Sequence, residues 1–204
     1  MKDLIILAAD LQQRTTIETL LFQRTQSFNI RLPSFDIFTH PGHDPGIYKY
    51  GGTFSADFNA QYHYALAILD AEWEGAPYPV ESITQKIQGD LDNGGWQDRS
   101  AVIVIDPELE IWVWSDSPHV YRELKMDLNA VRQYGEDRGY WAADEDKPTR
   151  PKELLEEILR QNRISRSAAF FSRLARRVAL TRCVDPAFDE LKNTLGIWFP
   201  LNQG

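Results

Sequence analysis

Continuous apolar runs of strand length occur at residues 4–9, 64–69 and 101–105, the second of them within a strand predicted over residues 61–69. Runs of this kind, bounded by polar residues, are typical of strands that are buried on both faces. A mixed run at residues 30–38 contains a proline, which favours a place near a sheet edge or a strand that begins only at Ser34. The hydrophobic pattern therefore predicts a sheet whose inner strands are covered on both sides.

Apolar residues at helical spacing lie between these runs. The first helix has a face of Ile17, Leu20, Leu21 and Phe28, with Thr15 or Thr16 as its cap. A second helix covers residues 79–91 and ends at the glycines that follow Asn93. Because strands and helices alternate, right-handed crossovers and parallel strands are expected. The predicted fold class is α/β, with a mainly parallel sheet flanked by helices.

The remaining segments carry weaker signals. Residues 39–46 contain two prolines and two glycines and predict a rigid loop, and residues 47–59 predict irregular structure leading into a short helix. Pro107 suits the first position of a helix that continues from Glu108, and Asp116 or Ser117 could cap a short helix through Leu124.

Residues 135–150 are rich in charge and predict a mobile surface connection. Helical patterns follow it, with apolar faces at residues 154–159, 167–178 and 186–195. We therefore expect an α/β domain over residues 1–134 and a helical extension over residues 135–204.

Composition restricts the function. Of the 204 residues, 43% are hydrophobic and 25% charged, which is enough to bury a core. The net charge of −8 argues against general, charge-driven nucleic-acid binding, although a local basic patch or a bridging metal ion could still contact phosphate. Cys183 is the only cysteine, so an internal disulfide is impossible. Without a signal-like or membrane-spanning run, we expect a soluble, cytoplasmic protein.

Acidic side chains follow three of the predicted strands. They are Asp10; Asp70 and Glu72; and Asp106, Glu108 and Glu110. Ligand sites of open α/β sheets lie beyond the carboxyl ends of strands, and Mg²⁺ or Mn²⁺ prefers oxygen ligands. We expect Asp10, Asp70 and Glu72 to meet at one cation, with Glu108 and Glu110 as further ligands. The alternatives are solvated strand ends, a helix cap, or first-turn positions of a helix for the last two.

These residues also resemble a known protein family. Leu69-Asp70-Ala71-Glu72, and the stretch Pro107-Glu108-Leu109-Glu110-Ile111-Trp112 followed by Asp116, resemble small bacterial TOPRIM-like proteins related to the nuclease half of OLD-family proteins. The resemblance covers residues 3–120. It implies a TOPRIM-like, Rossmann-like fold and a place in bacterial defence, including methylation-associated systems.

The resemblance implies roles for individual acids. TOPRIM enzymes bind Mg²⁺ through a glutamate after the first strand and an Asp-x-Asp after a later one, and they cleave or transfer phosphodiesters. By position these residues are Asp10, Asp70 and Glu72, so the expected activity is that of a metal-dependent nuclease or phosphoryl-transfer protein. Asp replaces Glu at the first position and Glu replaces the second Asp, which changes the geometry. The alternative is a catalytically inactive interaction subunit of a multi-protein defence complex.

A basic concentration lies in the C-terminal part. It comprises Arg160, Arg163, Arg166, Arg173, Arg176, Arg177 and Arg182. Arginine forks suit phosphates, so these helices could contact nucleic acid or a defence-system protein; alternatively they form a solvated face paired with neighbouring acids. Arg14, or less directly Arg99, is a candidate phosphate ligand nearer the acids.

His40, His43 and Asp44 could bind a transition metal, or His43 could border the same cleft as Asp70. No Gly-x-Gly-x-x-Gly, Walker-type loop or Gly-x-Ser-x-Gly elbow is present.

Overall fold

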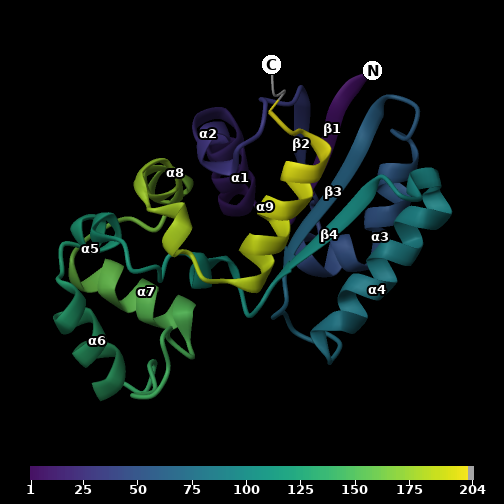
Figure 1. The fold of residues 1–204 in the computed structure, drawn as a ribbon. Coiled ribbons are helices and arrows are strands. Elements are labelled where there is room, and N and C mark those ends of the chain that lie inside the picture. Colours follow the sequence, from purple (N-terminus) through teal and green to yellow (C-terminus); the bar gives the residue numbers. More distant parts are fainter. Residues whose placement is uncertain (202–204) are drawn as a thin grey trace.

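The computed structural model describes residues 1–201. Its centre is a parallel sheet with the strand order β2-β1-β3-β4 (Figure 1). The strands are β1 (Lys2–Ala8), β2 (Phe35–Thr39), β3 (Tyr62–Asp70) and β4 (Ser100–Ile105). Ala8 pairs with both Thr39 and Ile68, and Asp70 pairs with Ile105, so the four strands end at one edge. The predicted parallel α/β sheet is confirmed.

Both faces of the sheet are covered by helices (Figure 1). Helices α3 (His43–Ala56) and α4 (Val80–Leu91) cover one face, where they bury Ile5 and Leu7 of β1. Helices α1 (Leu11–Gln23) and α9 (Pro186–Trp198) cover the other face. Because side chains alternate along a strand, a run that is apolar at every position supplies both of these cores.

Helices α5 to α8 form a group beside α1, which we call the helical lobe (Figure 1). Its members are α5 (Pro118–Leu124), α6 (Leu128–Asp137), α7 (Pro151–Gln161) and α8 (Ala168–Arg177). The guanidinium of Arg24, which follows α1, donates to the carbonyls of Ala175 and Val178 at the end of α8. These bonds satisfy helix-end carbonyls that would otherwise lack partners, and they tie the lobe to the sheet domain.

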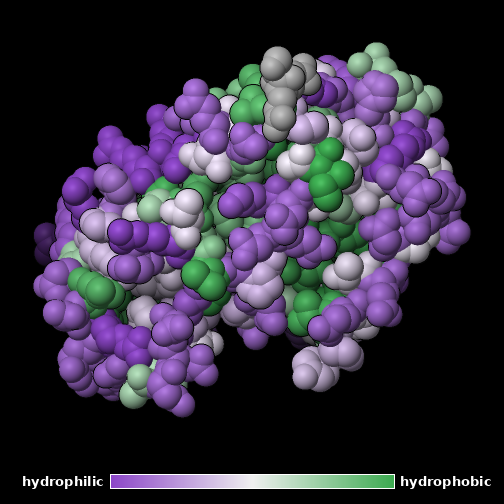
Figure 2. All heavy atoms as spheres, viewed as in Figure 1, coloured by the Kyte–Doolittle hydropathy of each residue, from purple (hydrophilic) through white to green (hydrophobic). Residues whose placement is uncertain are grey.

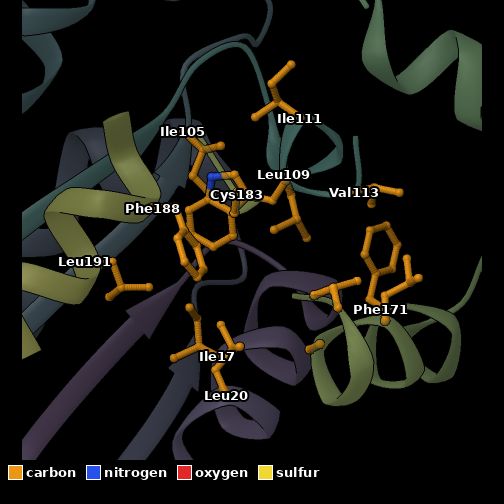
Figure 3. Packing of buried hydrophobic residues seen from close by; sticks show 14 of the residues in the cluster. Ile17, Leu20, Ile105, Leu109, Ile111, Val113, Phe171, Cys183, Phe188 and Leu191 are labelled. Atoms are coloured by element: carbon orange, nitrogen blue, oxygen red, sulfur yellow. The ribbon is translucent and has the colours of Figure 1, made fainter. Parts of the chain in front are cut away.

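The core on the α1 side continues into the helical lobe. Figure 3 shows Leu20 of α1, Leu109 beyond β4, Phe171 of α8 and Phe188 of α9 around one apolar region. A cavity of about 40 Å³ remains among them. Outside, Figure 2 shows mainly hydrophilic residues on one face of the molecule, with apolar residues in separate areas. No helix within residues 1–201 is both long and apolar enough to span a membrane.

Short elements complete the described chain. They are α2 (Thr25–Phe28), a π-helical turn (Asp92–Trp96), and 3₁₀ turns at Leu109–Trp112 and Leu180–Arg182. A single bridge between Ile30 and Pro200 joins the end of α2 to the chain beyond α9. The predicted division at residue 134 falls inside α6 and stays a prediction.

The prediction for residues 39–59 was wrong, because α3 occupies most of this segment. Its glycines are needed for close packing. A side chain at Gly46 would collide with the ring of His40, and one at Gly52 would collide with the backbone of Asp90 in α4. Glycine weakens the sequence signal of a helix, and here tertiary contacts compensate for that cost.

Two further local predictions were wrong. Asp10, not a threonine, caps α1 through a bond from the Gln13 amide to its Oδ1. Glu108 is extended, so helical structure begins only at Leu109, as a 3₁₀ turn. The charged segment after α6 lies on the surface as predicted, with residues 143–146 exposed, but it is anchored to α6. Trp141 is 5% exposed and lies under the Arg132 guanidinium, which also donates to carbonyls of this segment.

Candidate functional site

Three aspartates converge at the carboxyl edge of the sheet. Asp10 follows β1, Asp44 lies in the first turn of α3 after β2, and Asp70 ends β3. The backbone N–H of Asp70 donates to Oδ1 of Asp44 at 2.8 Å. We call these three residues the acid edge. The structure thus brings the predicted Asp10 and Asp70 together and adds Asp44 to them.

Gln13 holds this group in place. Its side chain is fully buried; Oε1 accepts from the Ala9 amide at 2.9 Å, and Nε2 donates to Oδ1 of Asp70 at 2.8 Å. The Leu109 amide donates to the same oxygen of Asp70 at 3.0 Å. Within residues 1–201, Oδ2 of Asp70 accepts no hydrogen bond, so one oxygen is anchored and the other is available for a ligand.

The carboxylates of the acid edge carry like charges and repel one another. Burial, followed by the charges of Asp44 and Glu110, holds the pKa of Asp70 well above its usual value, and Asp10 adds to this. Burial also raises the pKa of Asp44, although its bond from the Asp70 amide acts in the opposite direction. In the described chain no Lys or Arg forms a salt bridge with any of the three. A bound cation would stabilise all of these carboxylates in their charged form.

Glu108 and Glu110 have a different environment. Each is almost fully buried beside the 3₁₀ turn after β4. Glu108 accepts from Nζ of Lys152 on α7 at 2.8 Å, and Glu110 accepts from the guanidinium of Arg166, which precedes α8. We call them the paired glutamates, because both expected ligands are neutralised by cations of the helical lobe.

Glu72 stands apart from the acid edge. Its side chain is exposed and borders a surface depression of about 390 Å³ together with Trp73, Glu108 and Lys152. Of the five predicted acids, Asp10 and Asp70 therefore lie together, Glu108 and Glu110 form ion pairs, and Glu72 is exposed. Within residues 1–201, no three His, Cys, Asp or Glu side chains are arranged to hold a metal ion together.

The turn that leads into α3, with His40 and His43, lies next to the acid edge. Nδ1 of His43 lies 3.2 Å from the Ala9 carbonyl oxygen, and His43 has a positive φ of 50°. Nδ1 of His40 accepts from the Gly42 amide at 3.0 Å, which fixes the turn before α3. His43 therefore lies next to the end of β1, and the expectation that it borders the same cleft as Asp70 stays a prediction.

The arginines proposed for phosphate binding differ in their contacts. Arg99 donates to the carbonyls of Asn59, Tyr62 and Gly95 and is a structural residue. Several members of the C-terminal group form ion pairs, namely Arg160 with Glu157, Arg166 with Glu110, Arg173 with Glu123 and Arg182 with Asp116. These pairs agree with the alternative of a face balanced by acids.

Asp44 and Gln13 were the residues that sequence reasoning missed as parts of an acidic site. Asp44 was considered only together with its neighbouring histidines, and the single available signal was its place after a predicted strand. Comparisons of the chain with protein-family models, curated proteins and solved structures found no match. The site must therefore be interpreted from its own geometry.

Proposed function

We propose that this chain is a divalent-metal-dependent phosphoryl-transfer protein, a TOPRIM-like nuclease of bacterial defence. The observation that carries the proposal is the acid edge, where carboxylates from three elements meet and none of them forms a salt bridge with a Lys or Arg of residues 1–201. Proteins rarely retain converging like charges unless a ligand stabilises them, because each charge raises the pKa of its neighbours.

The donor set suits a hard cation. Mg²⁺ usually takes one or two carboxylates and keeps several waters, so a preformed group of three ligands is not required. Asp70, through its available Oδ2, and Asp44 would hold the ion, and Asp10 would face it from the start of α1. The bound cation would polarise a phosphoryl oxygen and lower the pKa of water. Gln13 and the Leu109 amide keep Asp70 oriented toward that position.

Calorimetric titration of Mn²⁺ and Mg²⁺ tests this proposal. Wild type should bind the ions, and Asp70→Asn should lose at least about tenfold in affinity, because a neutral amide replaces a charged ligand. Asp57→Asn, which removes an exposed acid at the end of α3, is the matched control and should bind like wild type. Absence of saturable binding to wild type would overturn the proposal.

Nucleic-acid cleavage supplies the second measurement. Purified protein should nick DNA or RNA in the presence of Mn²⁺ or Mg²⁺, and the Asp70→Asn variant should not. Nicking of equal rate by this variant would indicate a contaminating nuclease. The role in defence further predicts that deletion of the gene raises phage plating efficiency on the native host.

The paired glutamates favour a second candidate, a catalytically inactive interaction subunit. Neutralisation of Glu108 and Glu110 and the exposure of Glu72 leave fewer acids for catalysis than the sequence predicted. This candidate predicts no metal-dependent cleavage but stable co-purification with products of neighbouring genes. A pull-down from the native host that recovers no such protein counts against it.

A further inference from the structure

Arg166 is a cation of the helical lobe that lies close enough to Asp10 of the acid edge to interact with its charge. It occupies the loop between α7 and α8, directly before Ser167, the cap of α8. Its guanidinium contacts Glu110, and it is close enough to Asp10 and Glu156 for their charges to raise its pKa, which burial alone would lower. The helical lobe therefore places a permanent positive charge beside the proposed metal site.

The guanidinium uses only part of its hydrogen-bonding capacity. Nε and Nη2 both donate to the same oxygen, Oε1 of Glu110, and Nη1 donates to no residue within 1–201. The Arg166 side chain is 28% exposed, whereas that of Glu110 is 2% exposed. Nε also lies 3.7 Å from Oε1 of Glu156, whose side chain is 50% exposed. The edge of the fork formed by Nε and Nη2 is thus held by glutamates, and Nη1 remains available to a ligand from outside.

This arrangement differs from that of a purely structural counter-ion. A buried arginine that only neutralises a carboxylate usually forms two parallel bonds to its two oxygens. Here the plane of the guanidinium is supported from another side by the ring of Phe171, 5.6 Å from the guanidinium carbon. A supported guanidinium with a free N–H edge can bind a second oxyanion, and phosphate, like carboxylate, matches the geometry of the arginine fork.

We propose that Arg166 binds a phosphoryl oxygen of the substrate and shares its guanidinium between that oxygen and Glu110. This inference rests on the proposed function and identifies the substrate as a phosphate-bearing molecule. The ligand chemistry is that of a phosphoryl oxyanion, supplied either by a nucleic-acid backbone or by a free phosphate. Glu110 then has the role of a competitor that occupies the fork in the absence of substrate.

Two variants of the pair test the assignment. Glu110→Gln removes the competing charge and leaves the guanidinium of Arg166, which is 28% exposed, beside Glu156. Glu110→Gln with Arg166→Gln removes both charges, so neither variant leaves a carboxylate buried without a partner. The probes are inorganic phosphate, measured by calorimetry, and a labelled short oligothymidylate, measured by fluorescence anisotropy. Arg138→Gln, directly after α6 of the same lobe, is the matched control for the loss of one exposed positive charge.

Glu110→Gln should bind at least one probe more tightly than wild type. The double variant should bind the same probe at least about tenfold more weakly than Glu110→Gln, which is the expected effect of losing charge-assisted hydrogen bonds. Arg138→Gln should match wild type. Binding of phosphate identifies a free anion as sufficient, and binding of the oligothymidylate alone identifies the nucleic-acid backbone as the source.

Equal binding by Glu110→Gln and the double variant, or no binding of either probe by any variant, would overturn the assignment. A separate Mn²⁺ titration of the same proteins distinguishes the two proposals. If wild type binds Mn²⁺ and phosphate binding is independent of Arg166, only the role of Arg166 fails. If Arg166-dependent phosphate binding occurs without any Mn²⁺ binding, the metal-dependent function fails and the anion site remains.

Discussion

The acid edge and the paired glutamates are two groups of carboxylates at the same end of the sheet, and they differ in how their charge is balanced. Asp10, Asp44 and Asp70 lie close together and form no salt bridge with a Lys or Arg of the described chain, whereas Glu108 and Glu110 each contact a basic side chain from the helical lobe. The first arrangement keeps charge available for a ligand. The second uses charge to join two parts of the fold.

This difference shows that the position of an acid after a strand does not by itself define its function. Glu110 follows β4 just as Asp10 follows β1, but the loop before α8 reaches only Glu110 with an arginine. The element that packs against a strand end therefore decides whether the acid there is neutralised or remains free. Variants that remove one charge at a time test this difference between the acid edge and the paired glutamates.

The largest effect is expected from Arg166→Ala. Loss of the guanidinium leaves the carboxylate of Glu110, which is 1% exposed, without a partner, and the free energy of unfolding should fall by about 3 kcal/mol. Urea unfolding monitored by tryptophan fluorescence measures this change. The double variant Glu110→Gln with Arg166→Gln should recover most of the loss, and an equal loss in both proteins would contradict the pairing argument.

A smaller loss is expected from Lys152→Ala. Glu108 is nearly buried, but Lys152 is 44% exposed, so solvent can partly replace the ammonium group. The free energy of unfolding should decrease by about 1.5 kcal/mol, which is typical of a hydrogen bond to a charged group. The same urea series measures it, with the exposed Lys49→Ala as control. A larger decrease in the free energy of unfolding for Lys152→Ala than for Arg166→Ala would contradict the predicted order of the two variants.

The smallest predicted change is a gain in the free energy of unfolding, in the variant Asp70→Asn. Because the pKa of Asp70 is raised in the fold, the native state holds a proton that the unfolded chain releases above the usual value of 3.8. The stability of wild type should therefore fall as the pH rises from 3.8 through the raised pKa. Asp70→Asn avoids this loss and should be more stable than wild type at pH 7.

Thermal unfolding of both proteins between pH 4 and pH 7 checks this prediction. The advantage of Asp70→Asn should shrink toward the acidic end, where the wild-type carboxyl is protonated in both states. Asp57→Asn should show no such trend. A variant that is less stable than wild type at pH 7 would mean that the hydrogen bonds from Gln13 and Leu109 need a charged acceptor.

Strands were the most predictable part of the fold, because an uninterrupted apolar run has few alternatives to a strand buried on both faces. Helix α3 could not be predicted, since the reason for its glycines is the approach of His40 and Asp90, which no local pattern reveals. The sequence also did not decide between two roles for Asp10, because a carboxylate that follows a strand can be either a metal ligand or a helix cap.

About half of the candidate site followed from the sequence. Asp10 and Asp70 lie at strand ends, and parallel pairing brings such ends together. Asp44 and Arg166 could not be placed in the same way, since one depends on where α3 begins and the other on how a loop more than fifty residues beyond Glu110 returns to the sheet. These contacts are properties of the tertiary packing.

Helix α9 carries a consequence for the order of synthesis. Phe188, Leu191 and Leu195 cover the same sheet face as α1, yet they lie beyond every other helix of residues 1–201. While a ribosome is still producing the chain, that face of β4 stays uncovered until α9 has emerged. A nascent chain stalled before Pro186 would expose this apolar surface of β4 to chaperones and proteases, so the cell can recognise and degrade an incomplete copy even though its acid edge has already been synthesised.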